Sequence, residues 1–150
     1  MFSGFTLSVL VLLFAGCPGR GGGEPRTASA TLSGDVEVPP AETNGTGEGT
    51  FTLNAAQTEL AFEVTASGLT GPVMAAHFHH APVGEAGQIV NDLTSLIEET
   101  NGQVTISGVW ELEAHDVEDL LAGNIYVNLH TDANPAGELR AQVEFDTLEP

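Results

Sequence analysis

The sequence has no lysine and only three arginines. Aspartate and glutamate together number 21, which gives a formal net charge of −18 at pH 7. A protein that binds nucleic acid needs a basic surface to neutralise phosphates, so the composition excludes that class. An anionic membrane would also repel the domain, so membrane attachment requires a lipid anchor. The acidity serves solubility or attracts cations, and the sequence leaves both interpretations open.

Cysteine occurs once, as Cys17, so no disulfide can form within the chain. Stability must therefore come from a packed core, and the length allows one such domain. The chain contains no Gly-x-Ser-x-Gly nucleophile elbow, and its glycine-rich stretch, residues 19–23, does not precede a helix. These absences argue against a serine or cysteine hydrolase and against a phosphate-binding loop.

The apolar run over residues 7–14 is too short to span a bilayer, and its length fits a secretory signal. Small residues follow it and lead into Cys17, an order that resembles a bacterial lipoprotein signal. We expect a signal peptide over residues 1–16, then a lipidated Cys17 and a flexible tether over residues 17–29. The domain, residues 30–146, would then be extracytoplasmic and anchored to the membrane by the lipid. An ordinary secretory signal with a chance cysteine is the alternative.

Apolar and polar residues alternate with a period of two through most of the domain, which indicates half-buried strands. Turn signals such as Asn101-Gly102 separate these runs. We predict an all-β fold: a single antiparallel Greek-key sandwich or barrel of about seven to eight strands with one or two short helices. The helices are expected over residues 92–99 and 114–122, the second one ending at Gly123. The expected core includes Phe51, Phe62, Met74, Phe78, Trp110, Val127 and Val143.

Three of the five histidines are expected on strand faces that point away from this core. If Phe78 points inward, His77 and His79 share the opposite face of the same strand. The same alternation places His130, with Tyr126 and Asn128, on the outer face of a later strand. Imidazole is a common ligand of zinc and copper, so a His-x-His pair and a third histidine predict a site for one of these ions.

A fourth metal ligand would be water or one of three additional candidates, which are Asp132, Glu138 and His80. The alternative to a metal site is that the histidines only cover a sheet, in a structural or adhesive module without metal. We expect His115, at the start of the predicted helix, to be solvated. Arg140 is expected near His130, paired with Glu138 or a neighbouring acid rather than binding an anion.

Five stretches of the sequence carry a family resemblance, and they are Leu32–Pro40, Gly49–Leu53, Ala75–His79, Leu120–Thr131 and Asn134–Gln142. In order and spacing they resemble the CHRD domain, named from chordin, over about residues 30–144. The resemblance implies an extracellular domain, often found in bacterial envelope proteins, whose biochemical role is poorly defined. The His-x-His strand also resembles copper–zinc superoxide dismutase in pattern alone, which makes a dismutase-like redox enzyme a third alternative.

Overall fold

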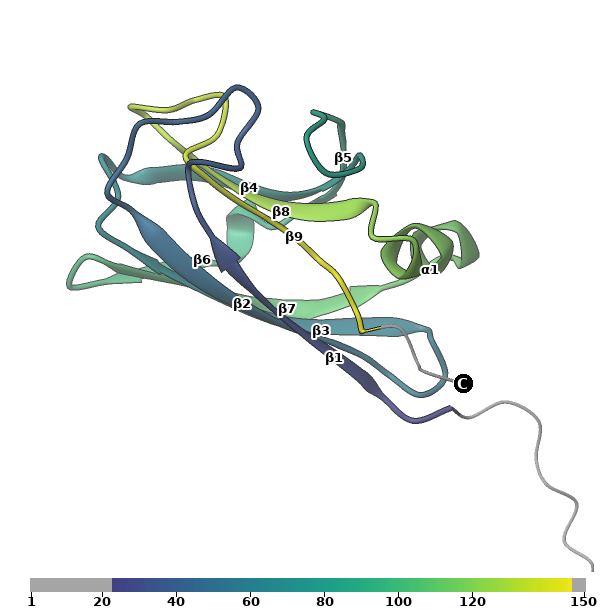
Figure 1. Ribbon diagram of the computed structural model, residues 1–150. Helices are drawn as coiled ribbons and strands as arrows, with labels where there is room; N and C mark the ends of the chain where they lie inside the picture. Colours follow the sequence, from purple (N-terminus) through teal and green to yellow (C-terminus); the bar gives the residue numbers. More distant parts are fainter. Residues whose placement is uncertain (1–22, 147–150) are drawn as a thin grey trace, which may run out of the picture.

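The computed structural model describes residues 23–146, in which two antiparallel sheets pack face to face (Figure 1). The expected signal peptide and Cys17 lie outside the described residues. The five-stranded sheet contains, in spatial order, β1 (Arg26–Leu32), β2 (Thr46–Leu53), β3 (Glu59–Ser67), β7 (Gln103–Glu111) and β6 (Ile97–Thr100). The four-stranded sheet contains β5 (Gln88–Asp92), β4 (Val73–His80), β8 (Ile125–Thr131) and β9 (Leu139–Gln142). The predicted all-β sandwich is confirmed, and its sheets do not close into a barrel.

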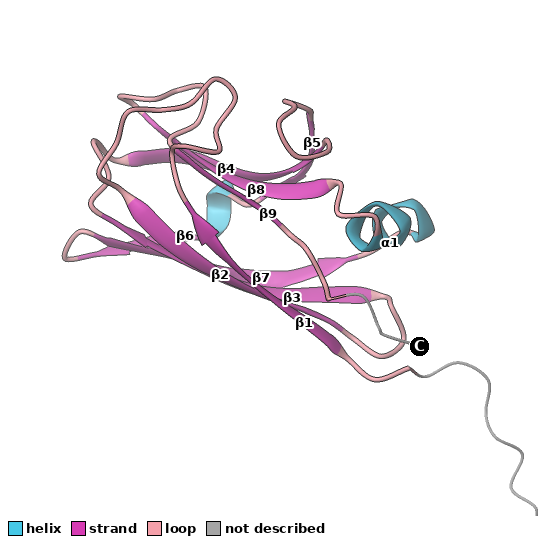
Figure 2. Cartoon of the chain, viewed as in Figure 1, coloured by secondary structure: helices cyan, strands magenta, loops and turns pink. Residues whose placement is uncertain are grey.

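Two short helices complete the described part of the chain: the 3-10 helix η1 (Thr94–Leu96) and α1 (Ala114–Leu121), which lies at one end of the sandwich (Figure 2). The prediction of α1 is confirmed. Glu113 and Asp116 form a reciprocal capping box at its start, and Gly123, with φ of 72°, follows its end. Neither helix has the length and hydropathy needed to cross a bilayer.

The helix expected over residues 92–99 is wrong except for the turn η1. Residues Ile97–Thr100 form β6 instead and pair with the start of β7. The connecting turn is Asn101-Gly102, in which both residues have positive φ, 52° and 78°. This turn type matches the twist of paired strands and favours a hairpin. Pairing with β7 therefore overrides the helical spacing of the apolar residues.

The core fills the space between the sheets, and its residues follow the predicted alternation. Phe78 is fully buried at its centre, where its ring lies 6.1 Å from that of Phe51, 5.1 Å from that of Phe62 and 5.3 Å from that of Trp110, between centroids. The expected core position of Met74 is wrong, because this side chain is 60% exposed. A register shift between Val73 and Ala75 breaks the alternation there.

The first strand begins earlier than the sequence suggested. We expected the tether to reach residue 29, but β1 starts at Arg26 and pairs along β2. Ala28 is buried opposite Phe51, so the small side chains of this segment suit a strand that packs closely on an aromatic residue.

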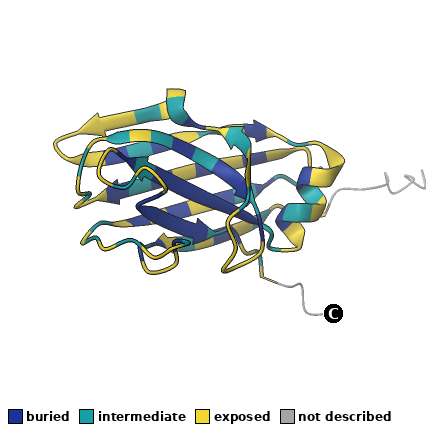
Figure 3. Cartoon of the chain, turned by 90° about the horizontal axis from the view of Figure 1, so that it is seen from above, coloured by how far each residue is buried: buried dark blue, intermediate teal, exposed yellow. Residues whose placement is uncertain are grey.

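The four-stranded sheet is covered on both faces, and this arrangement positions the candidate site. Its inner face lies on the core, while residues 33–45 and 81–87 fold over its outer face (Figure 1). Strand β8 is consequently buried at every position except His130, which is half-buried, and seen from above the middle of this sheet is largely buried (Figure 3). The outer face therefore carries a second, polar buried layer.

Candidate metal centre

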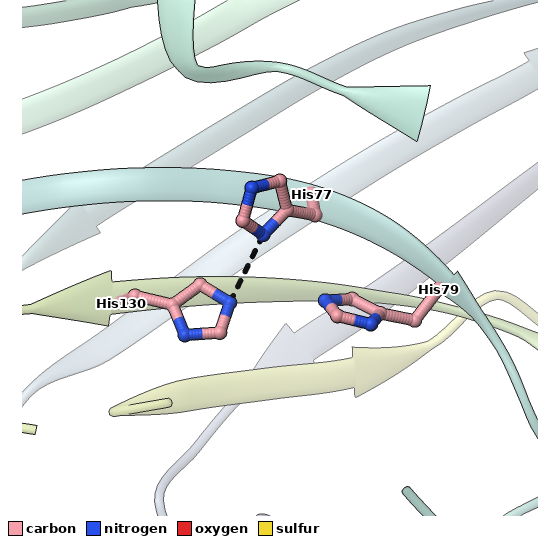
Figure 4. A group of neighbouring side chains, drawn as sticks. All are labelled: His77, His79 and His130. Carbon is pink, nitrogen blue, oxygen red and sulfur yellow. Dashed lines mark hydrogen bonds between the residues drawn. The ribbon is translucent and has the colours of Figure 1, made fainter. Parts of the chain in front are cut away.

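Three histidines converge on the outer face of the four-stranded sheet (Figure 4). Strands β4 and β8 are neighbours, with His77 opposite Asn128 and His79 opposite Tyr126. His130 lies two residues beyond Asn128, so the rings of His79 and His130 approach that of His77 from opposite sides. The strand facing predicted from the sequence thus brings the His-x-His pair and the third histidine together.

The three rings enclose a common point. Their centroids are 5.4 Å apart for His77 and His79, 4.9 Å for His77 and His130, and 5.9 Å for His79 and His130. One nitrogen from each ring lies within 4.8 Å of the others. Nitrogens bound to one tetrahedral zinc ion are about 3.4 Å apart, so small ring movements would close the site on an ion.

The hydrogen bond of His79 fixes which of its nitrogens can bind a metal. Its Nδ1 lies 3.0 Å from the carbonyl oxygen of Gly87, which can only accept, so Nδ1 carries the proton. The lone pair is then on Nε2, which is buried and has no hydrogen-bond partner among residues 23–146. Its environment therefore leaves this nitrogen free for an ion.

His130 follows the same arrangement, and His77 differs in the position of its proton. Nδ1 of His130 donates to the carbonyl oxygen of Pro135 at 3.1 Å, which leaves the lone pair on Nε2. That nitrogen accepts a hydrogen bond from Nδ1 of His77 at 3.1 Å (Figure 4), so the proton on His77 Nδ1 must move to Nε2 before this ring can bind an ion. Nε2 of His77 lies 3.7 Å from Oδ1 of Asp92. Each ring thus has one nitrogen facing the shared point and the other facing an oxygen. Ligand histidines are commonly oriented in this way.

Burial lowers the pKa of His79 below its ordinary value, and the neighbouring His77, His130 and Arg140 add to this effect. Burial also lowers the pKa of His130. Hydrogen bonds to Gly87 and Pro135 oppose these shifts without reversing them. Both imidazoles are therefore neutral near pH 7, which is the form that binds a metal.

The three additional ligand candidates lie elsewhere. Asp132 is exposed and lies against Gly71 at the turn before β4. Nε2 of His80 lies 3.2 Å from Oδ1 of Asp119 on α1. Glu138 is fully buried among hydroxyl and amide donors. The group that could hold an ion in residues 23–146 is thus formed by the three histidines alone.

A family model of the CHRD domain matches residues 28–143. The chain belongs to the CHRD domain family. The resemblance seen in the sequence is thereby confirmed, and the match includes all three histidines. No curated protein and no solved structure matched the chain.

In this CHRD domain Glu138 joins three loops. Its carboxylate accepts hydrogen bonds from the hydroxyl of Thr43 at 2.6 Å, the hydroxyl of Thr70 at 2.7 Å and that of Thr131 at 2.6 Å. The amide of Thr70 and the side chain of Asn134 donate as well, at 2.8 and 3.2 Å. Burial favours the neutral acid, but these donors outweigh it and lower the pKa of Glu138 to about 2.

Arg140 stabilises the loop that covers the CHRD domain's histidine site. It is buried, and its guanidinium donates to the carbonyl oxygens of Glu85 at 2.7 Å and Pro82 at 3.4 Å. Its Cζ atom lies 3.5 Å from the centroid of the Tyr126 ring. Tyr126 in turn stacks on His79, with the centroids 4.8 Å apart and the planes 5° from parallel. The expected pairing with Glu138 is replaced by this stack and the loop carbonyls.

Sequence reasoning missed a buried acid beside the site. Glu37, on the loop before β2, accepts a hydrogen bond from Nδ2 of Asn128 at 3.2 Å. Glu37 Oε1 and Asn128 Oδ1 are buried without partners in the described part of the chain, and a Cβ at Gly137 would lie 2.6 and 2.7 Å from them. Burial raises the pKa of Glu37 to about 7, although Arg140 opposes the shift. A proton on Oε1 could bond to Asn128 Oδ1 and supply both orphan oxygens with a partner.

The Glu37 carboxyl should make stability depend on pH near neutrality. Its folded pKa of about 7 lies above its ordinary value of 4.5, so its contribution is full below pH 4.5 and is lost as pH rises through 7. The loss approaches about 3 kcal/mol in alkaline solution. We expect urea unfolding of Glu37→Gln to lack this decline, because its neutral amide can bond to Asn128 at any pH. Glu42→Gln, an exposed residue of the same loop, should keep the decline of the parent protein.

Proposed function

We propose that this protein is an exported cell-envelope CHRD domain that binds a transition metal ion, copper or zinc, through His77, His79 and His130. The observation that supports this most directly is the orientation of the three rings. One nitrogen of each faces a common point, and the other lies near an oxygen of Gly87, Pro135 or Asp92. Such oxygens orient metal-binding histidines and increase their basicity.

The position of the site in the sheet also supports binding. Paired strands hold the backbone of all three residues, and the polar loops over them fix the rings of His79 and His130. His77 and His130 remain half-buried rather than fully enclosed, so an ion can enter from solvent. A site with three protein ligands leaves a coordination position for water or another small ligand.

Export and anchoring belong to the same proposal and depend on the N-terminal sequence. The apolar run before Cys17 indicates secretion, and the cysteine that follows suggests lipid attachment. The membrane is thus the expected partner of the lipid, while the acidic domain remains in the aqueous phase. Extracytoplasmic placement agrees with the CHRD family assignment.

Calorimetric titration of the metal-free protein with zinc and with Cu(II) tests the metal site. We expect saturable binding of one ion, and His79→Ala or His130→Ala should weaken it by at least about a hundredfold, because only two ligands remain. His115→Ala, whose side chain is 74% exposed, should bind like the parent protein. Affinity should decrease on acidification mainly below the ordinary histidine pKa of about 6.5, since burial lowers the pKa of His79 and His130.

A metal-free structural or adhesive module is the second candidate. It is favoured by the contact between Nδ1 of His77 and Nε2 of His130, which satisfies both nitrogens at 3.1 Å without an ion. In that case the same titration would give no saturable heat, or the histidine variants would bind as the parent does. Either result would reject the proposed metal site.

A further inference from the structure

The candidate ligands carry no negative charge. The cluster consists of three imidazoles, each of which binds a metal in its neutral form. A divalent ion bound there would keep its full 2+ charge, because no ligand neutralises it. Cu(I) would carry a charge of only 1+. The cost of moving an ion from water into a partly buried site increases steeply with its charge. Three neutral imidazoles offset none of this cost, which is smaller for the monovalent ion.

A permanent cation lies behind one of the ligands. Arg140 stacks on Tyr126, and Tyr126 stacks on His79, so a guanidinium is two ring planes from the ion site. Arginine does not deprotonate in proteins, and this one is only 2% exposed, so water screens its charge poorly. It therefore repels a 2+ ion more strongly than a 1+ ion.

Three carboxyl groups act in the opposite direction, and the effect of each is weakened. Glu138 accepts a hydrogen bond from Thr131, the residue after His130, and its five donors offset part of its negative charge. Asp92 lies 3.7 Å from Nε2 of His77, but its side chain is 69% exposed and therefore well screened. Glu37 is beside Asn128, and burial keeps its carboxyl partly protonated near pH 7. Arg140 is thus the buried charge that stacks, through Tyr126, on a ligand ring.

On the basis of the proposed metal site, we propose that the His77–His79–His130 cluster is a Cu(I) site, which binds Cu(I) in preference to Cu(II) and Zn(II). Three nitrogen ligands, with no fourth donor from the residues that the structure describes, suit the low coordination numbers of Cu(I). Burial and the charges around the ligands tune a metal's reduction potential. The Arg140–Tyr126–His79 stack makes Arg140 a positioning residue, because it holds the loop whose Gly87 carbonyl orients His79.

The affinities for the three ions decide the proposal. Cu(I) is titrated anaerobically into the full chain in competition with bicinchoninate, and Cu(II) and Zn(II) are titrated by calorimetry. Every sample carries Cys17→Ser, because a thiolate also binds Cu(I). We expect the dissociation constant for Cu(I) to be at least about a hundredfold lower than those of both divalent ions.

Histidine-dependent binding of Cu(II) or Zn(II) as tight as that of Cu(I) would overturn the Cu(I) preference alone. Failure of all three ions to bind would reject the metal site itself.

Charge variants test the cause of the preference through the reduction potential of the bound copper. Arg140→Gln should lower the ratio of Cu(I) to Cu(II) affinity by about tenfold or more, while Arg140→Lys, which keeps the charge, should restore part of it. Asp92→Asn should raise the ratio, and this exposed position should tolerate the change. Circular dichroism checks the fold of each variant. Unchanged potentials in Asp92→Asn and in a folded Arg140→Gln would overturn the electrostatic explanation.

Discussion

Glu138→Gln is expected to destabilise the domain by about 3–5 kcal/mol, because it removes a buried charge that satisfies five donors. The amide of the variant must direct its own N–H bonds toward at least one of these donors. Thr43, Thr70 and Thr131 would then lose partners, and the loops before β2 and before β4 would separate from the end of β8. Urea unfolding measures the loss, and Glu63→Gln, at an exposed position of β3, should change stability by less than about 0.5 kcal/mol.

The same variant should change the response to acid. The folded pKa of Glu138, about 2, lies below its ordinary value of 4.5. Its contribution is therefore full above pH 4.5 and is lost as pH falls toward 2. The parent protein should lose stability over this range more steeply than Glu138→Gln. Parallel stability curves for the two proteins between pH 5 and 2 would contradict the role assigned to the carboxylate.

Phe78→Ala should destabilise the domain by about 3–5 kcal/mol, the usual cost of truncating a buried aromatic side chain. Phe78 packs on Phe51 and Phe62 of the five-stranded sheet and on Trp110, so its loss opens a cavity between the two sheets. This loss is a large share of the stability of a small domain, which is typically about 5–15 kcal/mol. Thermal unfolding followed by circular dichroism measures the effect.

Val109→Ala is the matched control for Phe78→Ala. Val109 lies on the outer face of β7 and is 60% exposed, so its truncation should shift the melting temperature little. A similar shift in both variants would mean that the sandwich does not depend on the aromatic contacts at its centre.

Sequence periodicity predicted the inner half of this fold well. The strands around Phe62, Phe78 and Val127 were found because each alternates apolar and polar residues against a single core. The same alternation placed His77, His79 and His130 on faces away from that core. Their convergence then required only that β4 and β8 pair, and they do.

The outer half could not be predicted, because non-local loop contacts create it. The burial of Asn128 and Arg140 depends on residues 33–45 and 81–87, which lie distant in sequence and cover the sheet. The alternation of apolar and polar residues along their strands had predicted that these side chains face solvent. A signal was present in Tyr126, Asn128 and His130, a run of polar and aromatic groups on one strand face that suggests a second buried layer.

Two local misassignments have local causes. The position of Met74 depends on a strand irregularity that no residue pattern marks, since Val73, Met74 and Ala75 are all apolar. The segment from Ile97 to Thr100 has helical spacing but pairs as the outermost strand of a hairpin. In both cases the register of pairing decided the outcome, and register is a property of two strands rather than one.

The four-stranded sheet is covered on both faces, by the core and by loops, whereas the five-stranded sheet is covered on one. The two sheets should therefore tolerate substitutions to different extents. On β8 almost any substitution meets packed atoms, whether it points to the core or to the polar layer. On the five-stranded sheet the outward positions of β2 and β3 are largely exposed, and their side chains can be exchanged without disturbing a neighbour. Surface charge, solubility and adaptation to different surroundings can therefore diverge on one side of the sandwich while the chemistry of the other side is preserved.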